Sequence, residues 1–216
     1  MKLVSFDAAG CTFERCNFNK LNSPHIVLGA GKNPSRYVDC TFDGIRFRKL
    51  LFGLARFERC SFLDVKIVNV FSHGAEFVDC VFSGTMNGAV FYGRVVGIDA
   101  EFISRRMNEI RGNDFSRMNL SDVSFRAGVD LRLQKLPVGE NYLYLRDAER
   151  KVAVVRRKYV ERSASEVRRN VLLYLGILSD EALDGQNELF LCRDSAPYLS
   201  DEIIENVWNE LVEATG

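Results

Sequence analysis

The chain has 216 residues, of which 47% are hydrophobic and 27% are charged, and its formal net charge is zero. This composition is typical of a folded protein with a core and excludes an intrinsically disordered chain. The start shows no signal-peptide pattern, and no run approaches the roughly 18 apolar residues of a membrane helix. We therefore expect a cytoplasmic protein that has no membrane partner and whose six cysteines stay reduced.

The zero net charge conceals segments of opposite sign. Residues 1–138 carry 19 Lys and Arg against 14 Asp and Glu. Residues 150–169 carry 8 basic and 2 acidic side chains, whereas residues 170–216 carry 1 basic and 10 acidic ones. We expect the basic stretch to pair with the acidic stretch, within one chain or across two, rather than to bind nucleic acid.

A spacing of five residues dominates the chain from Tyr37 to Phe102. Of the fourteen positions reached in steps of five, eleven are large and apolar, and twelve of the positions two residues earlier are apolar and mostly small. A helix has a period of 3.6 and a strand a period of 2, so this pattern requires a backbone that turns a corner every five residues. The inward positions that recur every twenty residues are Phe42, Phe62, Phe82 and Phe102 and, two residues before each, Cys40, Cys60, Cys80 and Ala100.

The pattern resembles that of the pentapeptide-repeat family. The resemblance implies a mainly β fold, a right-handed quadrilateral β-helix of about six coils with four fives in each coil. We expect this β-helix over residues 1–136 and a C-terminal α-helical segment over residues 137–216. Two shifts in the phase of the repeat predict loops at about 25–36 and 103–113.

The cysteines fit the repeat better than they fit a chemical site. Ala100 continues the series of Cys40, Cys60 and Cys80, so the position asks for a small side chain that tolerates burial. A zinc site needs about four ligands gathered at one point, and thiols in a row do not provide it. Neither histidine stands in a catalytic pattern. We expect no catalytic residue, no metal and no cofactor, and a protein that is not an enzyme.

After Pro137 the spacing of the apolar residues becomes helical and the five-residue repeat ends. We predict a strand at 142–145 and helices at 147–161, at 166–178 and from Ser200 onwards. The last helix has an apolar stripe opposite acidic side chains. The stripe can cover the open end of the β-helix or, as the resemblance implies, form a homodimer interface, and both alternatives stay open. Its residues are Ile203, Ile204, Val207, Trp208 and Leu211.

These features predict a rigid, non-enzymatic module that binds a protein partner of unknown identity through basic side chains of its loops. The alternative is that these side chains are only solvated. The resemblance also implies a DNA-mimicking modulator or protector of DNA gyrase or a related topoisomerase, as in antibiotic or toxin resistance. Duplex DNA carries one negative charge per about 1.7 Å. Basic residues outnumber acidic ones in residues 1–138, and this excess disfavours a DNA-mimicking function. The candidate partner-binding residues are Arg105, Arg106, Arg111, Lys32 and Arg36.

Overall fold

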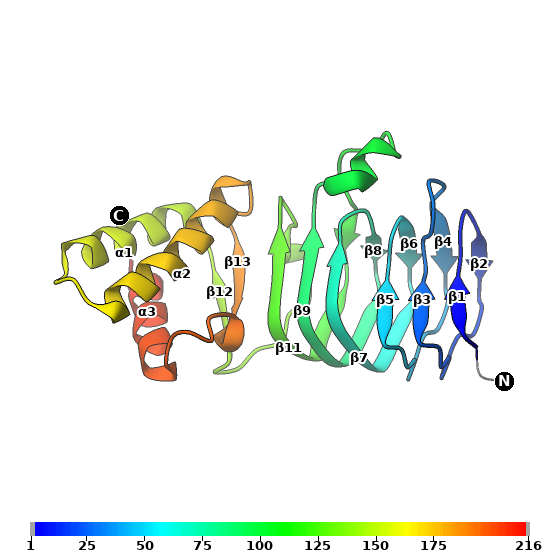
Figure 1. Cartoon of the computed structure of the whole chain (residues 1–216), viewed down its shortest axis with the longest axis horizontal. Helices are drawn as coiled ribbons and strands as arrows, with labels where there is room; N and C mark the ends of the chain where they lie inside the picture. The colour runs from blue at the N-terminus through cyan, green and yellow to red at the C-terminus, as the bar shows by residue number, and fades with distance from the viewer. Residues whose placement is uncertain (1–2, 215–216) are drawn as a thin grey trace.

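The computed structural model describes residues 3–214, apart from the side chains of residues 98 and 99. The fold is mainly β, and its parallel strands follow one another along the long axis of the molecule (Figure 1). This arrangement is compatible with a β-solenoid. Three helices gather at the C-terminal end, and none of the helices within the described residues is long and apolar enough to cross a membrane.

The period of twenty residues is the separation of neighbouring strands. Ser35 pairs with Ala55, and Ser61 pairs with Val81, each in parallel register. We call each such passage of the chain along the rod a pass. The parallel sheets have the orders β1-β3-β5, β10-β8-β6-β4-β2 and β11-β9-β7. Their strands are β1 (Ser5–Asp7), β2 (Thr12–Glu14), β3 (His25–Val27), β4 (Ser35–Val38), β5 (Lys49–Leu51), β6 (Ala55–Glu58), β7 (Ser61–Ser72), β8 (Glu76–Val78), β9 (Val81–Tyr92), β10 (Ile110–Arg111) and β11 (Asp114–Arg126).

The C-terminal part combines an antiparallel hairpin with the helices, and most of it has a hydrophobic core of its own. The second helix is longer than the sequence predicts. Strand β13 was not predicted, because its four consecutive buried residues lack the alternation that marks a half-exposed strand. The elements are β12 (Tyr142–Leu145), α1 (Ala148–Glu161), α2 (Glu166–Leu183), β13 (Leu189–Cys192) and α3 (Asp201–Glu213), and short 3₁₀ turns lie at Gly97–Glu101, Leu131–Leu133 and Arg193–Ser195.

Columns of stacked rings fill the rod. Neighbouring strands lie about 4.8 Å apart, so a ring at the same position of each pass meets the next ring at contact distance. Along Phe42, Phe62, Phe82 and Phe115 the ring centroids are 4.6 to 5.0 Å apart and the planes lie within 10° of parallel. Cys40, Cys60 and Cys80 lie beside this column and are at most 1% exposed.

Phe102 and Ala100 do not belong to these columns, contrary to the sequence prediction. Ala100 is exposed, and Phe102 is half-buried in an excursion outside the strands. Phe115 takes the place predicted for Phe102. Asn113 takes the place beside Cys80, whose backbone N–H donates to Asn113 Oδ1 at 3.0 Å.

The error arises because this pass is longer than twenty residues: Phe115, which stacks on Phe82, lies 33 positions further along the chain. One residue is missing from the repeat after Phe82, and an excursion then adds residues. The five-residue grid places the next inward side chain at position 87, whereas Met86 and Phe91 are the buried ones. The register between β7 and β9 shifts in the same pass. The chain then leaves the strands directly after β9, so the second excursion occupies 93–109 instead of the predicted 103–113.

The first excursion, unlike the second, is shorter than predicted. Strand β3 occupies the first three residues of the expected loop 25–36, and the chain lies outside the strands only at 28–34. Both excursions project from the same edge of the rod (Figure 1). The Lys32 ammonium lies 5.0 Å from the centroid of the Phe102 ring, so the two excursions touch each other there.

The apolar stripe of α3 packs within the chain. Ile204, Val207 and Leu211 are at most 2% exposed and Trp208 is 6% exposed, while Ile203 is half-buried. Packing against α1 and α2 covers the stripe, and Trp208 Nε1 donates to the hydroxyl of Tyr174 in α2 at 3.2 Å. The prediction of a dimer interface at this stripe is therefore wrong, because the helical core already uses these side chains.

The hairpin β12–β13, rather than α3, covers the last pass of the rod. The Phe190 ring lies 6.3 Å from the ring of Phe125 in β11 and stacks on Tyr142 at 5.3 Å. The Cys192 thiol donates to the backbone carbonyl of Val123 at 3.7 Å. The ring columns of the rod thus continue directly into the C-terminal part.

Charged side chains form a ladder across the five-stranded sheet. Arg56 contacts the carboxylates of Glu58 at 2.6 Å, Glu76 at 3.3 Å and Glu109 at 2.7 Å. Glu58 also binds Arg36 at 3.0 Å. These partners come from successive passes, so the ladder ties the passes together on the outside of the rod. The hydrogen bond from Arg36, followed by that from Arg56, lowers the pKa of Glu58 to about 2.

We predict that Phe62→Ala lowers the free energy of unfolding by about 3–5 kcal/mol, because a fully buried ring is lost between two stacked neighbours. Cys60→Ala, two residues away, should cost only about 1 kcal/mol, since the smaller side chain leaves a small cavity. Urea denaturation of both variants measures the difference. Equal losses would mean that the thiol has a role besides packing.

We predict that Glu58→Gln destabilises the protein at pH 7 by on the order of 2 kcal/mol and that this difference shrinks toward zero at pH 2. A carboxylate whose folded-state pKa is lowered contributes stability above its unfolded pKa and loses it as the pH falls through the folded pKa. For Glu58 that window runs from its ordinary pKa of 4.5 down to about 2. Denaturation at pH 7, 4 and 2.5 tests this, and a difference that is constant with pH would contradict it.

Candidate functional site

Two of the arginines that the sequence nominates hold the second excursion and its return strand to the rod. Arg105 donates to the backbone carbonyl of Gly74 at 2.5 Å, and its Nε lies 3.3 Å from the Glu76 carboxylate. Arg111 binds Glu109 at 2.6 Å. Both arginines form ion pairs within the chain, so these side chains stabilise the fold.

The remaining nominated residues do not gather into one site. Arg36 belongs to the charged ladder, and Lys32 lies over the Phe102 ring. Arg106 is exposed and forms no ion pair with any residue that the structure describes. The five basic side chains therefore do not form a common surface with free charges.

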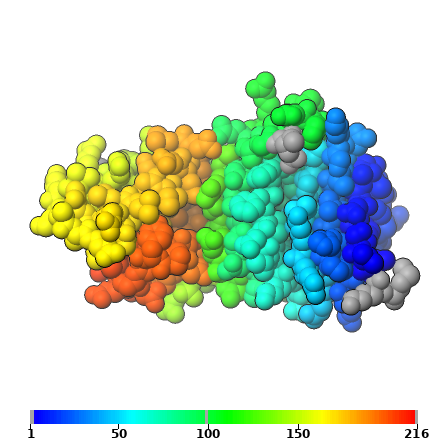
Figure 2. All heavy atoms as spheres, viewed as in Figure 1, coloured from blue at the N-terminus to red at the C-terminus, as the bar shows by residue number. Residues whose placement is uncertain are grey.

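A groove of about 420 Å³ opens elsewhere, at the seam between two of the parallel sheets. β5 ends the sheet β1-β3-β5, and β7 ends the sheet β11-β9-β7. Within the described chain, hydrogen bonding between these two passes stops after Gly44, whose N–H donates to the Leu63 carbonyl at 2.7 Å. It resumes where Arg56 pairs with Glu76. We call the space along this seam the seam groove; β5 and β7 lie side by side in the middle of the rod (Figures 1 and 2).

The seam exists because the passes turn their corners in two different ways. In the later passes the corner residues Asn69, Gly88 and Asp122 have positive φ values of 53°, 62° and 50°. They lie opposite one another in the registers of β7, β9 and β11. The earlier passes have no positive φ at 24–25 or at 48–49. The backbone on either side of this change follows different paths, so β5 and β7 do not pair.

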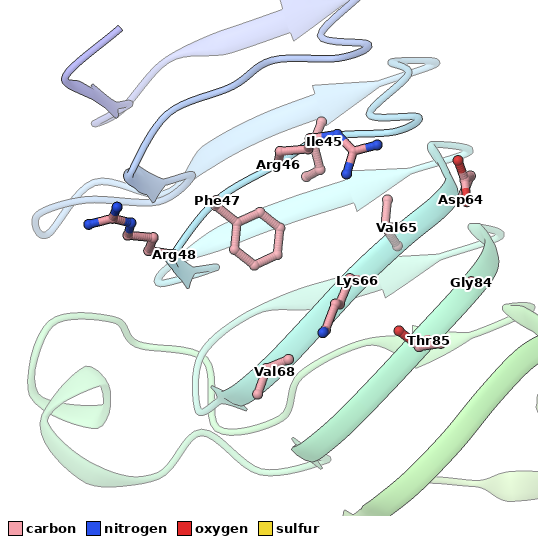
Figure 3. A pocket seen from close by; sticks show the side chains of 10 residues that line it. All are labelled: Ile45, Arg46, Phe47, Arg48, Asp64, Val65, Lys66, Val68, Gly84 and Thr85. Carbon is pink, nitrogen blue, oxygen red and sulfur yellow. The ribbon is translucent and has the colours of Figure 1, made fainter. Parts of the chain in front are cut away.

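Three cations surround the seam groove. Arg46 and Arg48 come from the segment that leads into β5, and Lys66 comes from β7 on the opposite side. Figure 3 shows the Phe47 ring in the middle of the group, with these three side chains around it. Within the described chain, none of the three forms an ion pair or a side-chain hydrogen bond. The other lining residues are Ile45, Asp64, Val65, Val68, Gly84 and Thr85.

The burial pattern of the groove follows from its strands. Arg46 and Arg48 are exposed while Phe47 between them is half-buried, as alternation along an extended segment requires. On the other side Lys66 is exposed, and Val68 two residues further on is 39% exposed. The groove thus has a charged rim and an apolar floor. Asp64 is the single acid that lines it.

The sequence gives a weak signal of this groove. Arg46, Arg48 and Lys66 occupy outward positions of the five-residue repeat, as many basic residues of the chain do. Nothing in their spacing distinguishes them from Arg36 or Arg111. What sets them apart is the absence of an acid at the neighbouring position of the next pass, together with the unpaired seam, and both depend on register.

The thiols and histidines form no reactive site in the structure. Burial raises the pKa of Cys40 to about 11 and that of Cys192 to about 12, so both stay protonated. His25 lies exposed in β3, and the His73 ring lies 5.2 Å from the ring of Tyr92. Within the part of the chain that the structure describes, no three His, Cys, Asp or Glu residues come together as a metal site does.

We compared the chain with known proteins. No family model matches the chain, and no curated protein matches it in sequence.

Proposed function

We propose that the chain is a pentapeptide-repeat protein with a right-handed quadrilateral β-helix, and that it acts as a rigid, non-enzymatic module for binding a protein partner at the seam groove. The observation that carries this proposal is the group of three cations, Arg46, Arg48 and Lys66, that have no acidic partner within the described chain. Elsewhere on the rod, Arg36, Arg56 and many other basic side chains are paired.

Unpaired charges beside exposed apolar side chains favour an acidic protein surface as the partner. Opposite charges speed the encounter and orient the complex, whereas the apolar floor supplies area that leaves water on binding. Val68 and the neighbouring Phe71, 39% and 54% exposed, extend the apolar surface beyond the groove. A rod whose passes are packed in register presents these side chains without the entropic cost of ordering a flexible loop.

The distribution of charge does not support the hypothesis that the protein mimics DNA. A DNA mimic has to present a continuous row of negative charges, about one per 1.7 Å of axis. On the five-stranded sheet the carboxylates of Glu58, Glu76 and Glu109 are neutralised by arginines, and the seam groove is cationic. We therefore do not propose a topoisomerase as the partner.

Helix α2 offers a surface for a homodimer that the sequence did not indicate. Leu173 and Ile177 are 56% and 42% exposed, and apart from the adjoining residues and the backbone of α2 itself no atom lies within 4 Å of the position that a Cβ on Gly176 would occupy. These residues share a stripe with Arg169 and Asp180. If two copies of α2 cross antiparallel about a twofold axis, Leu173 of each faces Gly176 of the other, and Arg169 faces Asp180. Such self-complementarity is what a twofold interface requires.

We predict that a photo-crosslinking residue placed at Val68, an uncharged lining residue of the groove, captures a protein partner from lysate and that Arg46→Glu abolishes this adduct. Arg106→Glu makes the same change of charge outside the groove and should leave the adduct intact. Mass spectrometry identifies the adduct, and loss of the adduct at 0.5 M salt is expected for charge-dependent binding. An adduct that survives Arg46→Glu, or no adduct, would remove the groove as the binding site.

We predict that the protein forms a dimer at micromolar concentration and that Leu173→Glu converts it to a monomer, because each copy would place a charge against the other's helix. Val212→Glu is the matched control, since Val212 in α3 is 54% exposed but lies outside the stripe. Light scattering coupled to size exclusion measures the mass. A monomeric protein at high concentration, or a dimer unaffected by Leu173→Glu, would contradict the α2 interface.

A further inference from the structure

We infer that the seam groove binds its partner as an extended acidic peptide segment, in which carboxylates at alternate positions flank an apolar residue. This inference rests on the proposed function, because it names the chemistry of the partner at the same groove. Three features carry it: the edges of β5 and β7, the spacing of the cations and the apolar floor.

The first feature is the pair of strand edges. Within the described chain, β5 has β3 as its hydrogen-bonded neighbour and β7 has β9, so each presents an unpaired edge to the seam. The segment before β5 already uses N–H groups toward the preceding pass, since Arg46 donates to Leu21 at 2.8 Å and Arg48 donates to Pro24 at 3.1 Å. An unpaired edge presents a row of backbone N–H and C=O groups that an extended peptide can pair with.

The second feature is the spacing of the charges. Arg46 and Arg48 are two residues apart on one extended segment, so their side chains emerge about 6.6 Å apart on the same face. A bound peptide in extended conformation repeats its side chains at the same interval. Carboxylates at two alternate positions of the peptide can therefore each meet one guanidinium. Lys66 stands on the opposite wall and can meet a third carboxylate.

The third feature is the floor. Between two acidic positions, the intervening side chain of an extended peptide points in the opposite direction. On this side of the groove lie Phe47, which is half-buried, and Val65, which is 2% exposed. An apolar side chain placed there contacts the ring and leaves water. The recognised pattern is therefore acid, apolar, acid.

The position of the groove between neighbouring strands and its lining separate this occupant from others. An α-helix is about 10–12 Å across with its side chains, too wide to enter between two neighbouring strands. Single-stranded nucleic acid is bound on exposed aromatic platforms. Phe47, the one aromatic residue that lines the groove, is half-buried and packs against the core. An extended peptide suits this lining.

The test is a binding titration with the full chain and labelled probes of matched charge, followed by fluorescence anisotropy. The main probe is the peptide Ac-Glu-Val-Glu-Val-Glu-amide carrying a dye. Its matched control has the same side chains with its backbone amides N-methylated at alternate positions, so that the N–H donors of one edge are lost while its charge is kept. A thymidine oligonucleotide of equal charge is the third probe. Arg46→Glu and Lys66→Glu are the site variants, and Arg106→Glu is the control variant.

The inference predicts that the unmodified peptide binds best. Loss of backbone pairing should weaken the N-methylated peptide by roughly tenfold, and each site variant should weaken the unmodified peptide by roughly tenfold or more. Arg106→Glu should leave the affinity unchanged. The exposure of Arg46 and Lys66 predicts that the site variants keep the unfolding midpoint of the parent protein, and denaturation checks this.

Other results would overturn the inference in distinguishable ways. Equal binding of the N-methylated peptide would show that the strand edges are not used, while the groove would still bind acidic protein and the proposed function would stand. Tighter binding of the oligonucleotide would replace the peptide by a nucleic acid and overturn both proposals. Binding unaffected by Arg46→Glu and Lys66→Glu would place the site outside the seam groove and would also overturn both. Binding of no probe, together with an intact crosslink at Val68, would overturn the extended segment alone.

Discussion

Register between neighbouring passes is the constraint on which the rest of the structure depends. Each strand pairs in parallel with one about twenty residues away, and the ring at each inward position then lies on the ring of the next pass at 4.6 to 5.1 Å. A strand that slipped by one residue would turn Phe62 outward and bring a charged or polar side chain into the column. Hydrogen bonding and ring stacking therefore specify the same alignment and stabilise each other.

The same register decides which surface charges are free. Arg56 meets Glu76 because the two occupy equivalent positions on adjacent passes. At the seam the register is interrupted, and Arg46 and Lys66 lie on either side of it without acidic partners in the described chain. A local failure of pairing thus produces both the groove and its unneutralised charge. For this reason we place the binding surface at this interruption between two passes of the rod and not in its excursions.

Much of the β fold could be predicted because a five-residue period requires a backbone that turns a corner every five residues. It identified the inward column of Phe42, Phe62 and Phe82 and explained the thiols beside them. The prediction failed at Phe102 and Ala100 because the chain leaves the strands after β9 and returns only at β10, so both residues lie in an excursion. One residue missing after Phe82 adds a shift of phase, which the apolar side chain of Tyr92 conceals. An excursion inserted into a repeat leaves almost no trace in composition, yet it displaces every later position.

The candidate site could not be predicted from the sequence. Arginines such as Arg105 and Arg111 were nominated because they lie in or beside a predicted loop, but pairing with Glu76 and Glu109 depends on which passes are adjacent. The stripe of α3 was recognised as apolar, and amphipathicity alone does not say whether a helix packs on its own chain or on another. In this protein α1 and α2 lie close enough to cover Ile204 and Leu211. The seam depends on corner conformations. Asn69, Gly88 and Asp122 favour the positive φ that they adopt and Lys49 does not, but this preference does not by itself indicate that neighbouring passes fail to pair.

Backbone amide exchange measured on the free protein and with the acidic peptide bound tests the role of the seam most directly. Amides that point into an unpaired seam exchange faster than those inside a sheet. The predicted result is fast exchange at some positions of 45–51 and 65–71 in the free protein and new protection of those positions when the peptide binds. Slow exchange along the whole of both segments in the free protein, or protection confined to the excursion at 93–109, would contradict the assignment of the binding site to the seam.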